Sequence, residues 1–320
     1  MRRFTFEAPD GDMAALEFGD PADRLAALWL HATGFNAMTY QSILAPLGLR
    51  TKVQAVDLRG HGRSTLPTAV TYKSWKRHRD DVIDFLDREA PTKPVVLGGH
   101  SMGACVALLV AGARPEKVAG LVLADPVILP PRVYTYAHIL PPVLAMINRG
   151  SGMARRARKR RQDFKSLEDA KASYEGRGAF KTWRSPFLSD YLIDGLDRID
   201  DNDTDCEDQT WRLTCAPKWE AATFAAQRNR PWGALAVVKQ RKIPITVLRP
   251  DSKSVMTDAV AARLTRKCPH LVLKERVNTS HFLPMEAPYD IRDELSEYIS
   301  TLIEGIALDE FGTVKRSLRD

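Results

Sequence analysis

The chain has 320 residues, of which 44% are hydrophobic and 27% charged, with a formal net charge of +7 and a pI near 9.2. This length allows a full hydrophobic core with one large insertion and excludes a small disulfide-stapled scaffold, and the apolar runs are too short to cross a membrane. Glu7, Asp10 and Asp12 interrupt the segment where a signal peptide needs an apolar stretch, so we expect a cytoplasmic protein without a membrane span.

In the first part of the chain, short apolar runs bounded by turn residues alternate with helix-like patterns. This alternation predicts an α/β fold with a mostly parallel central sheet and helices on both faces. Strands are expected at residues 25–30, 53–58, 95–99 and 118–124, and helices at 74–89 and 102–113.

The alternation stops at about residue 130, where proline-flanked, charged and aromatic segments begin. These segments hold four tryptophans and show no strand pattern, so we expect an inserted, mainly helical cap. Six basic residues lie between Ala154 and Arg161 (ARRARKRR). Such a run usually forms one solvated helix face, and because no aromatic interleaving or nucleic-acid fold motif surrounds it, no nucleic-acid partner is expected. An attraction for anionic substrates or surfaces stays open.

After the cap the alternation resumes. Strands are expected at residues 243–249 and 271–276, and helices at 257–267 and 287–303. The predicted organisation is therefore a core in two parts, residues 1–130 and 241–320, with the cap insertion at residues 131–240.

The cysteine spacing bears on metal and disulfide chemistry. Cys105, Cys206, Cys215 and Cys268 contain no Cys-x-x-Cys pair, which argues against a zinc site and predicts free thiols in an intracellular protein. Only Cys206 and Cys215 are close enough in sequence to suggest a disulfide. No metal or nucleotide motif occurs, so no cofactor or metal is expected.

The pentapeptide Gly99-His100-Ser101-Met102-Gly103 places a Gly-x-Ser-x-Gly motif between an expected strand and an expected helix. A serine on this tight turn is exposed above the sheet, and the flanking glycines avoid a Cβ clash with neighbouring backbone. The helix N-terminus supplies N–H groups for a developing oxyanion, with the Met102 N–H as the expected donor. Ser101 is the candidate nucleophile, against the alternative of a purely structural turn.

Residues 30–35 (LHATGF) and 57–64 (DLRGHGRS), together with the Ser101 motif, resemble segments of the α/β-hydrolase superfamily. Ala32 stands where the family usually has glycine. The resemblance implies that the Thr33 N–H is the second oxyanion donor and that His31 ties down its loop. His61 is expected to serve a structural turn, because its segment is rich in glycine.

A serine hydroxyl needs a neighbouring base to remove its proton, and His281 is the candidate. It follows the expected strand at residues 271–276, in a segment that resembles the family's Gly-His-x-x-x-x-Glu-x-Pro pattern. Glu286 and Pro288 complete this pattern, and Ser280 replaces the glycine. The other histidines, at positions 78, 100, 138 and 270, are expected to contact solvent, packed side chains or substrate.

Two aspartates compete for the role of the acid that orients the histidine. The family's common position lies just after the strand at residues 243–249, where an ungapped alignment places Lys253, with Asp251 two residues early. Asp125, at the end of the strand at residues 118–124, occupies an alternative position that some family members use. We favour Asp125, with Asp251 as the alternative acid and a structural cap as the other explanation for Asp125.

The resemblance implies a serine hydrolase of the esterase and lipase kind, acting through an acyl-enzyme on a carboxylic ester, lactone or thioester. The expected partner is a small molecule with an apolar acyl group. A carbon–carbon bond hydrolase on the same fold remains open, as does a hydrolase-like ligand-binding protein, because residues Ala32, Lys253 and Ser280 depart from the family pattern. The oligomeric state and the leaving group are left open.

Overall fold

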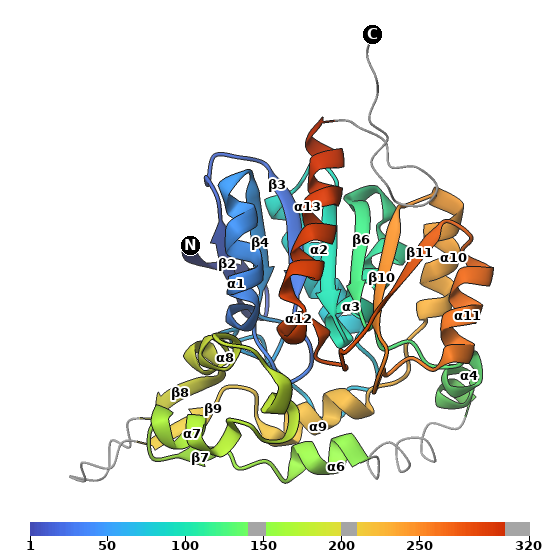
Figure 1. Cartoon of the computed structure of the whole chain (residues 1–320). Coiled ribbons are helices and arrows are strands. Elements are labelled where there is room, and N and C mark those ends of the chain that lie inside the picture. The colour runs from blue at the N-terminus through green and yellow to red at the C-terminus, as the bar shows by residue number, and fades with distance from the viewer. Residues whose placement is uncertain (140–151, 200–209, 305–320) are drawn as a thin grey trace.

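A computed structural model of the chain describes residues 1–139, 152–199 and 210–304. Eight strands form one sheet in the order β1-β2-β4-β3-β5-β6-β10-β11, in which β2 runs antiparallel to both neighbours and the strands from β4 to β11 are parallel (Figure 1). The predicted α/β fold with a mostly parallel sheet is confirmed. The strands are β1 (Arg2–Ala8), β2 (Gly11–Phe18), β3 (Leu25–Leu30), β4 (Lys52–Val56), β5 (Val95–His100), β6 (Val118–Ala124), β10 (Ile245–Pro250) and β11 (Leu271–Arg276).

All six strands predicted from apolar runs are present, and their ends lie within two residues of the predicted ones. Strands β3 and β5 are buried at every residue, which a parallel sheet covered on both faces requires. Strand β4 ends at Val56, before the predicted end at residue 58, because Asp57 leaves the ladder and its N–H donates to the Ala14 carbonyl.

The sequence analysis missed the N-terminal hairpin of β1 and β2, in which Arg2 pairs with Glu17 and Ala8 with Gly11. The signal was present, because Phe4 and Phe6 alternate with polar residues and Pro9-Asp10-Gly11 is a typical turn sequence. Strand β1 lies at the sheet edge and is largely exposed, which explains its weak apolar pattern.

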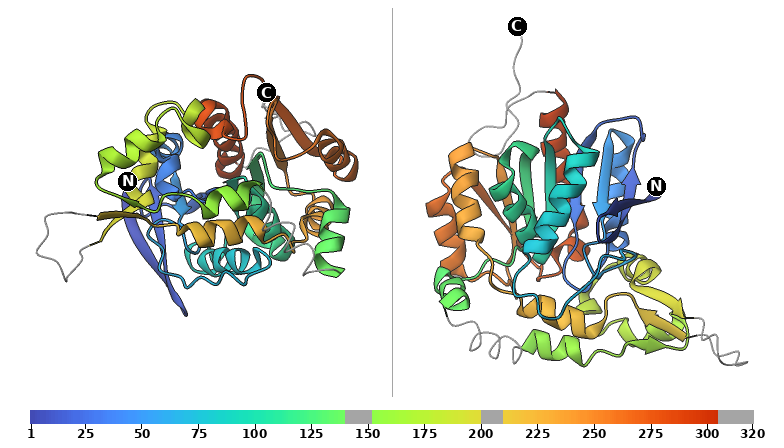
Figure 2. Two further views of the ribbon diagram at one scale, coloured as in Figure 1. Left: turned by 90° about the horizontal axis from the view of Figure 1, so that it is seen from below. Right: turned by 180° about the vertical axis from the view of Figure 1, so that it is seen from behind.

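Helices cover both faces of the sheet (Figures 1 and 2). Buried side chains place α2, α3, α10 and α11 on one face and α1 and α13 on the other. In α2 the buried residues follow the helical repeat at positions 78, 81, 82, 85 and 86, so one stripe faces the sheet. These helices are α1 (Gln41–Leu44), α2 (Lys76–Glu89), α3 (Met102–Ala113), α10 (Pro231–Arg241), α11 (Asp258–Lys267), the short α12 (Leu283–Glu286) and α13 (Pro288–Glu304).

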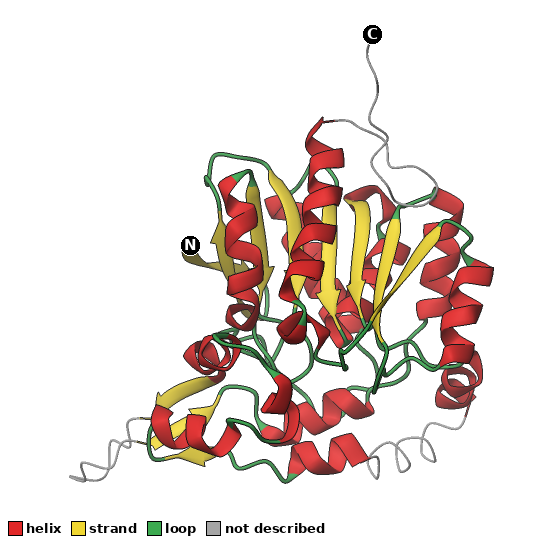
Figure 3. Ribbon diagram, in the orientation of Figure 1, coloured by secondary structure: helices red, strands yellow, loops and turns green. Residues whose placement is uncertain are grey.

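The segment between β6 and α10 lies beyond the carboxyl ends of the parallel strands (Figure 1). Its described helices are α4 (Pro131–Ile139), α6 (Gly152–Arg158), α7 (Leu167–Tyr174), α8 (Phe187–Gly195) and α9 (Pro217–Ala225). Besides these helices the segment contains a small sheet in the order β7-β9-β8, for which the sequence showed no strand pattern (Figure 3). Its strands β7 (Asp163–Phe164), β8 (Leu196–Ile199) and β9 (Thr210–Leu213) are too short and too polar for an alternation to show in sequence.

Helix α10 packs against α3, with Ala234 directly over Gly112, and so belongs to a helical layer of the core. The predicted division of the chain at residue 240 remains a prediction. Phe180, Phe187 and Tyr191 of the cap join the same buried cluster as Ile291 of α13. The cap is therefore fixed over the strand ends by a continuous aromatic and aliphatic core.

Three of the four cysteines, Cys105, Cys215 and Cys268, are buried free thiols, and Cys206 lies outside the described residues. Within the described ranges, no helix is both long enough and apolar enough to cross a membrane.

Candidate active site

Ser101 occupies the turn between β5 and α3 with a strained backbone, at φ 56° and ψ −113°. Its side chain is nearly buried, with 4% of the residue exposed. Gly103 allows this turn, because a Cβ at that position would lie 2.2 Å from the Leu30 carbonyl oxygen. The N-terminus of α3 can therefore pack directly on the end of β3, which brings the backbone of residues 31–33 close to Ser101.

His281 lies on the loop between β11 and α12, and its ring joins the two other candidates. The Ser101 hydroxyl lies 3.0 Å from His281 Nε2, and His281 Nδ1 lies 2.7 Å from Asp125 Oδ2. In the neutral ring, Nδ1–H donates to the carboxylate and Nε2 accepts from the hydroxyl. Three residues from three separate loops thus form one hydrogen-bonded line.

Asp125 follows β6 and is completely buried, with φ at 37°. Besides His281, it accepts hydrogen bonds from the Ser254 hydroxyl at 2.6 Å and from the Val255 N–H at 3.1 Å. The loop after β10, where the family's commoner acid is expected, therefore holds the Asp125 carboxylate in place instead of supplying an acid.

Asp251, the alternative acid, has other partners. Its carboxylate accepts from the backbone N–H groups of Asn278 at 2.8 Å and Thr279 at 3.1 Å. It braces the start of the loop that leads to His281, and its hydrogen bonds do not include the imidazole. Of the two candidates, the structure brings Asp125 to His281.

The two expected oxyanion donors lie next to each other. Thr33 follows β3, Met102 is the first residue of α3, and the Thr33 hydroxyl contacts Met102 Sδ at 3.3 Å. Among the backbone hydrogen bonds of the described residues, neither N–H donates to another protein group. Both N–H groups are therefore free to bind an oxyanion.

Tyr40 and His100 connect this loop to the loop of His281. The Tyr40 hydroxyl accepts from the Ala32 N–H at 3.2 Å and donates to His100 Nδ1 at 2.8 Å, and His100 Nε2–H donates to the His281 carbonyl at 2.7 Å. Burial lowers the pKa of His100 well below its usual range, so the ring is neutral, as these bonds require. The sequence analysis missed Tyr40, because nothing local marks a tyrosine that acts between two distant loops.

The prediction that His31 holds its loop in place is confirmed by the two hydrogen bonds of its ring. Its Nδ1–H donates to the Ala32 carbonyl at 2.8 Å, and its Nε2 accepts the Leu58 N–H at 2.8 Å. Burial lowers the pKa of His31 well below its usual range, and that of the adjacent His61 to about 4. These histidines are neutral structural residues at neutral pH.

Glu286 supports His281 through its neighbour Ser280. The Ser280 N–H donates to this buried carboxylate at 2.5 Å, and the Ser280 hydroxyl donates at 2.7 Å. Ser280, which stands where the family has glycine, therefore adds a hydrogen bond next to His281. Thr182 of the cap adds another hydrogen bond to the same Glu286 carboxylate.

Arg160 and Glu220 form an ion pair beside Gly34, in the loop that follows β3. Arg160 Nη1 lies 2.7 Å from Glu220 Oε2, and the exposed fractions of the two side chains are 19% and 8%. Arg160 Nη2 also donates to the hydroxyls of Tyr174 at 3.1 Å and Tyr191 at 3.0 Å. A Cβ on Gly34, which has φ at +81°, would lie 2.6 Å from Glu220 Oε1, so the pair rests directly on the residue after Thr33.

The basic run at residues 154–161 begins in α6 and continues past its end, and its side chains differ in their surroundings. Arg155, Arg156, Arg158 and Lys159 are exposed, as a solvated face requires, but that expectation is wrong for Arg160. The sequence could not reveal its pairing, because Glu220 lies 60 residues away.

Aromatic rings surround the histidine on the cap side. Phe282 lies 5.6 Å from the His281 ring and 6.1 Å from Trp183, measured between ring centroids. Phe35 lies 5.0 Å from Trp183 and 6.2 Å from Phe282. This group, Phe35, Trp183 and Phe282, is called the aromatic wall below. It gives the surroundings of His281 an apolar character.

A family model described as "Alpha/beta hydrolase family" matches residues 27–294, which is most of the chain. The chain belongs to the alpha/beta hydrolase family. Its fold is similar to that of E-2-(acetamidomethylene)succinate hydrolase, with a TM-score of 0.71 and 19% identity over 93% of this chain and 99% of the other. A thioesterase domain from the curacin biosynthetic pathway is similar as well, with a TM-score of 0.73 and 20% identity over 92% of this chain and 99% of the other. At these identities the likeness shows the fold alone.

Among curated proteins, this alpha/beta hydrolase is 34% identical to the human monoglyceride lipase over 122 residues, 37% of this chain and 40% of the lipase. It is also 34% identical to an esterase from Mycobacterium tuberculosis over 115 residues, 36% of this chain and 37% of the esterase. The matched part thus spans about two fifths of the length of these relatives.

Proposed function

We propose that this protein is a serine hydrolase that cleaves an ester-type bond of a small molecule with an apolar acyl group. The observation that carries the proposal is the hydrogen-bonded line from the Ser101 hydroxyl through His281 to Asp125. A serine, a histidine and a buried carboxylate in this order are the parts that nucleophilic acyl transfer needs.

In the proposed mechanism, Ser101 Oγ attacks the carbonyl carbon of the substrate while His281 Nε2 takes the hydroxyl proton. Asp125 holds the ring in the required tautomer and stabilises the imidazolium that forms. The backbone N–H groups of Thr33 and Met102 bind the oxyanion of the tetrahedral intermediate. When the intermediate collapses, the bond to the leaving group breaks and His281 returns the proton to that group.

The acyl-enzyme is then hydrolysed. His281 takes a proton from water as the water oxygen attacks the acyl carbonyl. When this intermediate collapses, the bond to Ser101 Oγ breaks, His281 returns the proton to Oγ, and the carboxylic acid is released. These steps are common to carboxylic esters, lactones and thioesters, because each presents a carbonyl with a displaceable oxygen or sulfur.

The aromatic wall supports the apolar nature of the acyl group. Phe35, Trp183 and Phe282 gather beside His281, and apolar surface of this kind binds hydrocarbon by removing it from water. The partial matches to a monoglyceride lipase and an esterase agree with an ester substrate.

The test is hydrolysis of p-nitrophenyl esters of increasing acyl length, together with labelling by a fluorophosphonate. The unmodified enzyme is expected to turn over these esters and to be labelled, and Ser101→Ala is expected to lose both. Asp125→Asn is expected to lower kcat by about 10⁴, because the amide favours the wrong histidine tautomer. Asp251→Asn, the matched control, is expected to change kcat by less than about tenfold, since it alters a loop brace.

Equal loss in the two aspartate variants would overturn the assignment of Asp125. If the unmodified protein shows neither turnover nor labelling, the hydrolase proposal fails, and a ligand-binding protein on this fold takes its place.

A further inference from the structure

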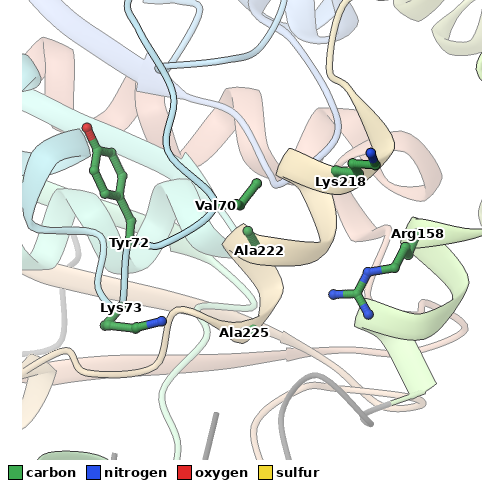
Figure 4. Close-up of a pocket in the computed structure, with 7 residues that line it drawn as sticks. All are labelled: Val70, Tyr72, Lys73, Arg158, Lys218, Ala222 and Ala225. Atoms are coloured by element: carbon green, nitrogen blue, oxygen red, sulfur yellow. The ribbon is translucent and has the colours of Figure 1, made fainter. Parts of the chain in front are cut away.

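A cavity lies where the cap segment meets the loop between β4 and α2 (Figure 4). Its volume is about 280 Å³, enough for a small organic molecule. Three elements line it: the loop with Tyr72 and Lys73, the end of α6 with Arg158, and one face of α9 with Lys218 and Ala222. Ser101, His281 and Asp125 are not among its lining residues, so it is distinct from the candidate active site.

The charged side chains of this cavity are all cationic. Lys73, Arg158 and Lys218 line it, and no aspartate or glutamate does. Among the ion pairs of the described residues, none involves any of these three. By contrast, Arg160 and Arg161, in the same basic run, are each paired with a carboxylate.

The side chains of Arg158 and Lys73 extend from opposite sides of the view toward its middle, where the end of α9 with Ala225 lies (Figure 4). The ammonium group of Lys218 is turned outward in the same view, on a flexible and exposed side chain. No carboxylate of the lining balances these cations, so an anion bound among them is attracted by all three. An arginine with a lysine opposite is suited to the oxygens of a phosphate group.

The remaining lining is apolar. Val70 is half exposed, with 53% of its surface accessible, and Ala222 presents only a methyl group. The Tyr72 ring is held edge-on against Trp219 at 5.8 Å, and Trp219 is fixed in turn by its hydrogen bond to the Arg59 carbonyl. A ligand that matched this cavity would carry an apolar portion beside its anionic group.

We propose that this cavity is a binding site for a phosphate monoester that carries a small apolar group. The doubly charged phosphate lies among the three cations, Lys73, Arg158 and Lys218, whose long side chains turn toward it. The apolar group packs against Tyr72, Val70 and Ala222. The site joins two cap helices to a core loop and goes beyond the proposed hydrolysis.

Titration calorimetry of the full chain tests the proposal, with phenyl phosphate, inorganic phosphate and benzyl alcohol as separate probes. Saturable binding of phenyl phosphate is expected, about tenfold tighter than that of inorganic phosphate, and weaker as the ionic strength rises. Benzyl alcohol, which has the ring without the charge, is expected to bind too weakly to measure.

The variants Lys73→Gln and Arg158→Gln are each expected to weaken phenyl phosphate binding about tenfold, and Lys218→Gln less. Lys159→Gln is the matched control, because it removes the same charge from the residue next to Arg158, outside the cavity, and it is expected to change the affinity less than twofold. Melting temperatures of all variants show whether each one is folded.

Several results would overturn the proposal. One is the absence of saturable phenyl phosphate binding to the folded protein, and another is an equal effect of Lys159→Gln and the cavity variants, which would indicate general attraction to a basic surface. A third is binding to phosphatidylcholine vesicles that contain phosphatidic acid without any binding of phenyl phosphate, which would assign the cations to a lipid surface. Equal affinity for inorganic and phenyl phosphate would refute the apolar part of the site.

Discussion

Replacing Glu220 with glutamine removes the carboxylate that faces the Arg160 guanidinium and keeps the volume of the side chain. The substitution leaves Arg160 with two tyrosine hydroxyls and a neutral amide oxygen as hydrogen-bond partners but without a counter-charge, in a place where 19% of its side chain is exposed. A nearly buried charge without its partner is costly, because the protein replaces little of the lost hydration.

The size of the effect follows from this burial. Removing one partner of a buried ion pair costs about 3 to 5 kcal/mol, and the partial exposure of Arg160 favours the lower end, about 3 kcal/mol. The entropy of unfolding is about 2.1 cal/mol/K per residue, so a chain of this size is expected to melt about 4 to 5 °C lower. Urea unfolding and thermal melting measure the two quantities.

The same substitution loosens the loop that carries the Thr33 N–H, because Glu220 lies against Gly34. Losing an oxyanion donor completely lowers kcat by about 10² to 10³, so a displaced donor is expected to lower kcat by about tenfold. KM is expected to change little, since the oxyanion forms only after the substrate binds. A change in KM alone would show that the pair shapes the binding pocket instead.

Two controls make the experiment decisive. Asp163→Asn breaks an exposed pair with Arg212, likewise between a carboxylate and an arginine of the cap segment, and is expected to cost less than about 1 kcal/mol. The double variant Arg160→Met with Glu220→Gln is expected to lose less stability than the two single variants added together, because it removes both buried charges. Equal costs for Glu220→Gln and Asp163→Asn would refute the reasoning.

Three further predictions concern single buried groups. Tyr40→Phe leaves the Ala32 N–H and a His100 nitrogen without a partner, so the free energy of unfolding should fall by about 1 to 3 kcal/mol; an unchanged urea midpoint would contradict this. Gly34→Ala places a Cβ at positive φ against Glu220, so it should destabilise the enzyme by about 1 to 3 kcal/mol. The loss should be smaller in a Glu220→Ala background, where the contact with the Glu220 carboxylate is absent; an equal loss would assign the whole effect to the backbone. Burial lowers the pKa of His78 to about 3, below the ordinary 6.5 of the unfolded chain. The unfolded state therefore binds a proton at His78 more readily than the folded state, and stability is lost as the pH falls below about 6.5. The variant His78→Phe should therefore be less sensitive to acid. Between pH 7.5 and 5.5 its free energy of unfolding in urea should rise by about 1.4 kcal/mol relative to that of the unmodified protein. Parallel pH curves for the two proteins would disprove a neutral His78.

Features set by short stretches of chain could be predicted from the sequence. The fully buried strands such as Leu25–Leu30 and Val95–His100 appear as uninterrupted apolar runs, and the repeat of α2 appears as a helical stripe. Ser101 could be placed on a strand-to-helix turn because the glycines that the turn needs are its immediate neighbours. The hairpin of β1 and β2 was missed, although Pro9-Asp10-Gly11 marked its turn, because an exposed edge strand has little apolar contrast.

Choices between distant residues could not be made in this way. Asp125 and Asp251 both follow core strands, and the sequence ranks them only by resemblance to the family. The folded chain distinguishes them: Asp125 is hydrogen-bonded to the His281 ring, whereas Asp251 is hydrogen-bonded to backbone N–H groups of the loop that precedes His281. The basic run predicts a solvated side chain for Arg160, but in the folded chain Arg160 is paired with Glu220.

The difference has one physical cause. Turns, strands and amphipathic helices depend on steric and hydrophobic preferences that act within about ten residues, so their signals are local. Hydrogen bonds and ion pairs such as Tyr40 with His100, or Arg160 with Glu220, depend on which segments packing brings into contact, across 60 residues of chain in each case. No local preference encodes such a partner, so these contacts become known only when the sheet, the cap and the loops between them are assembled.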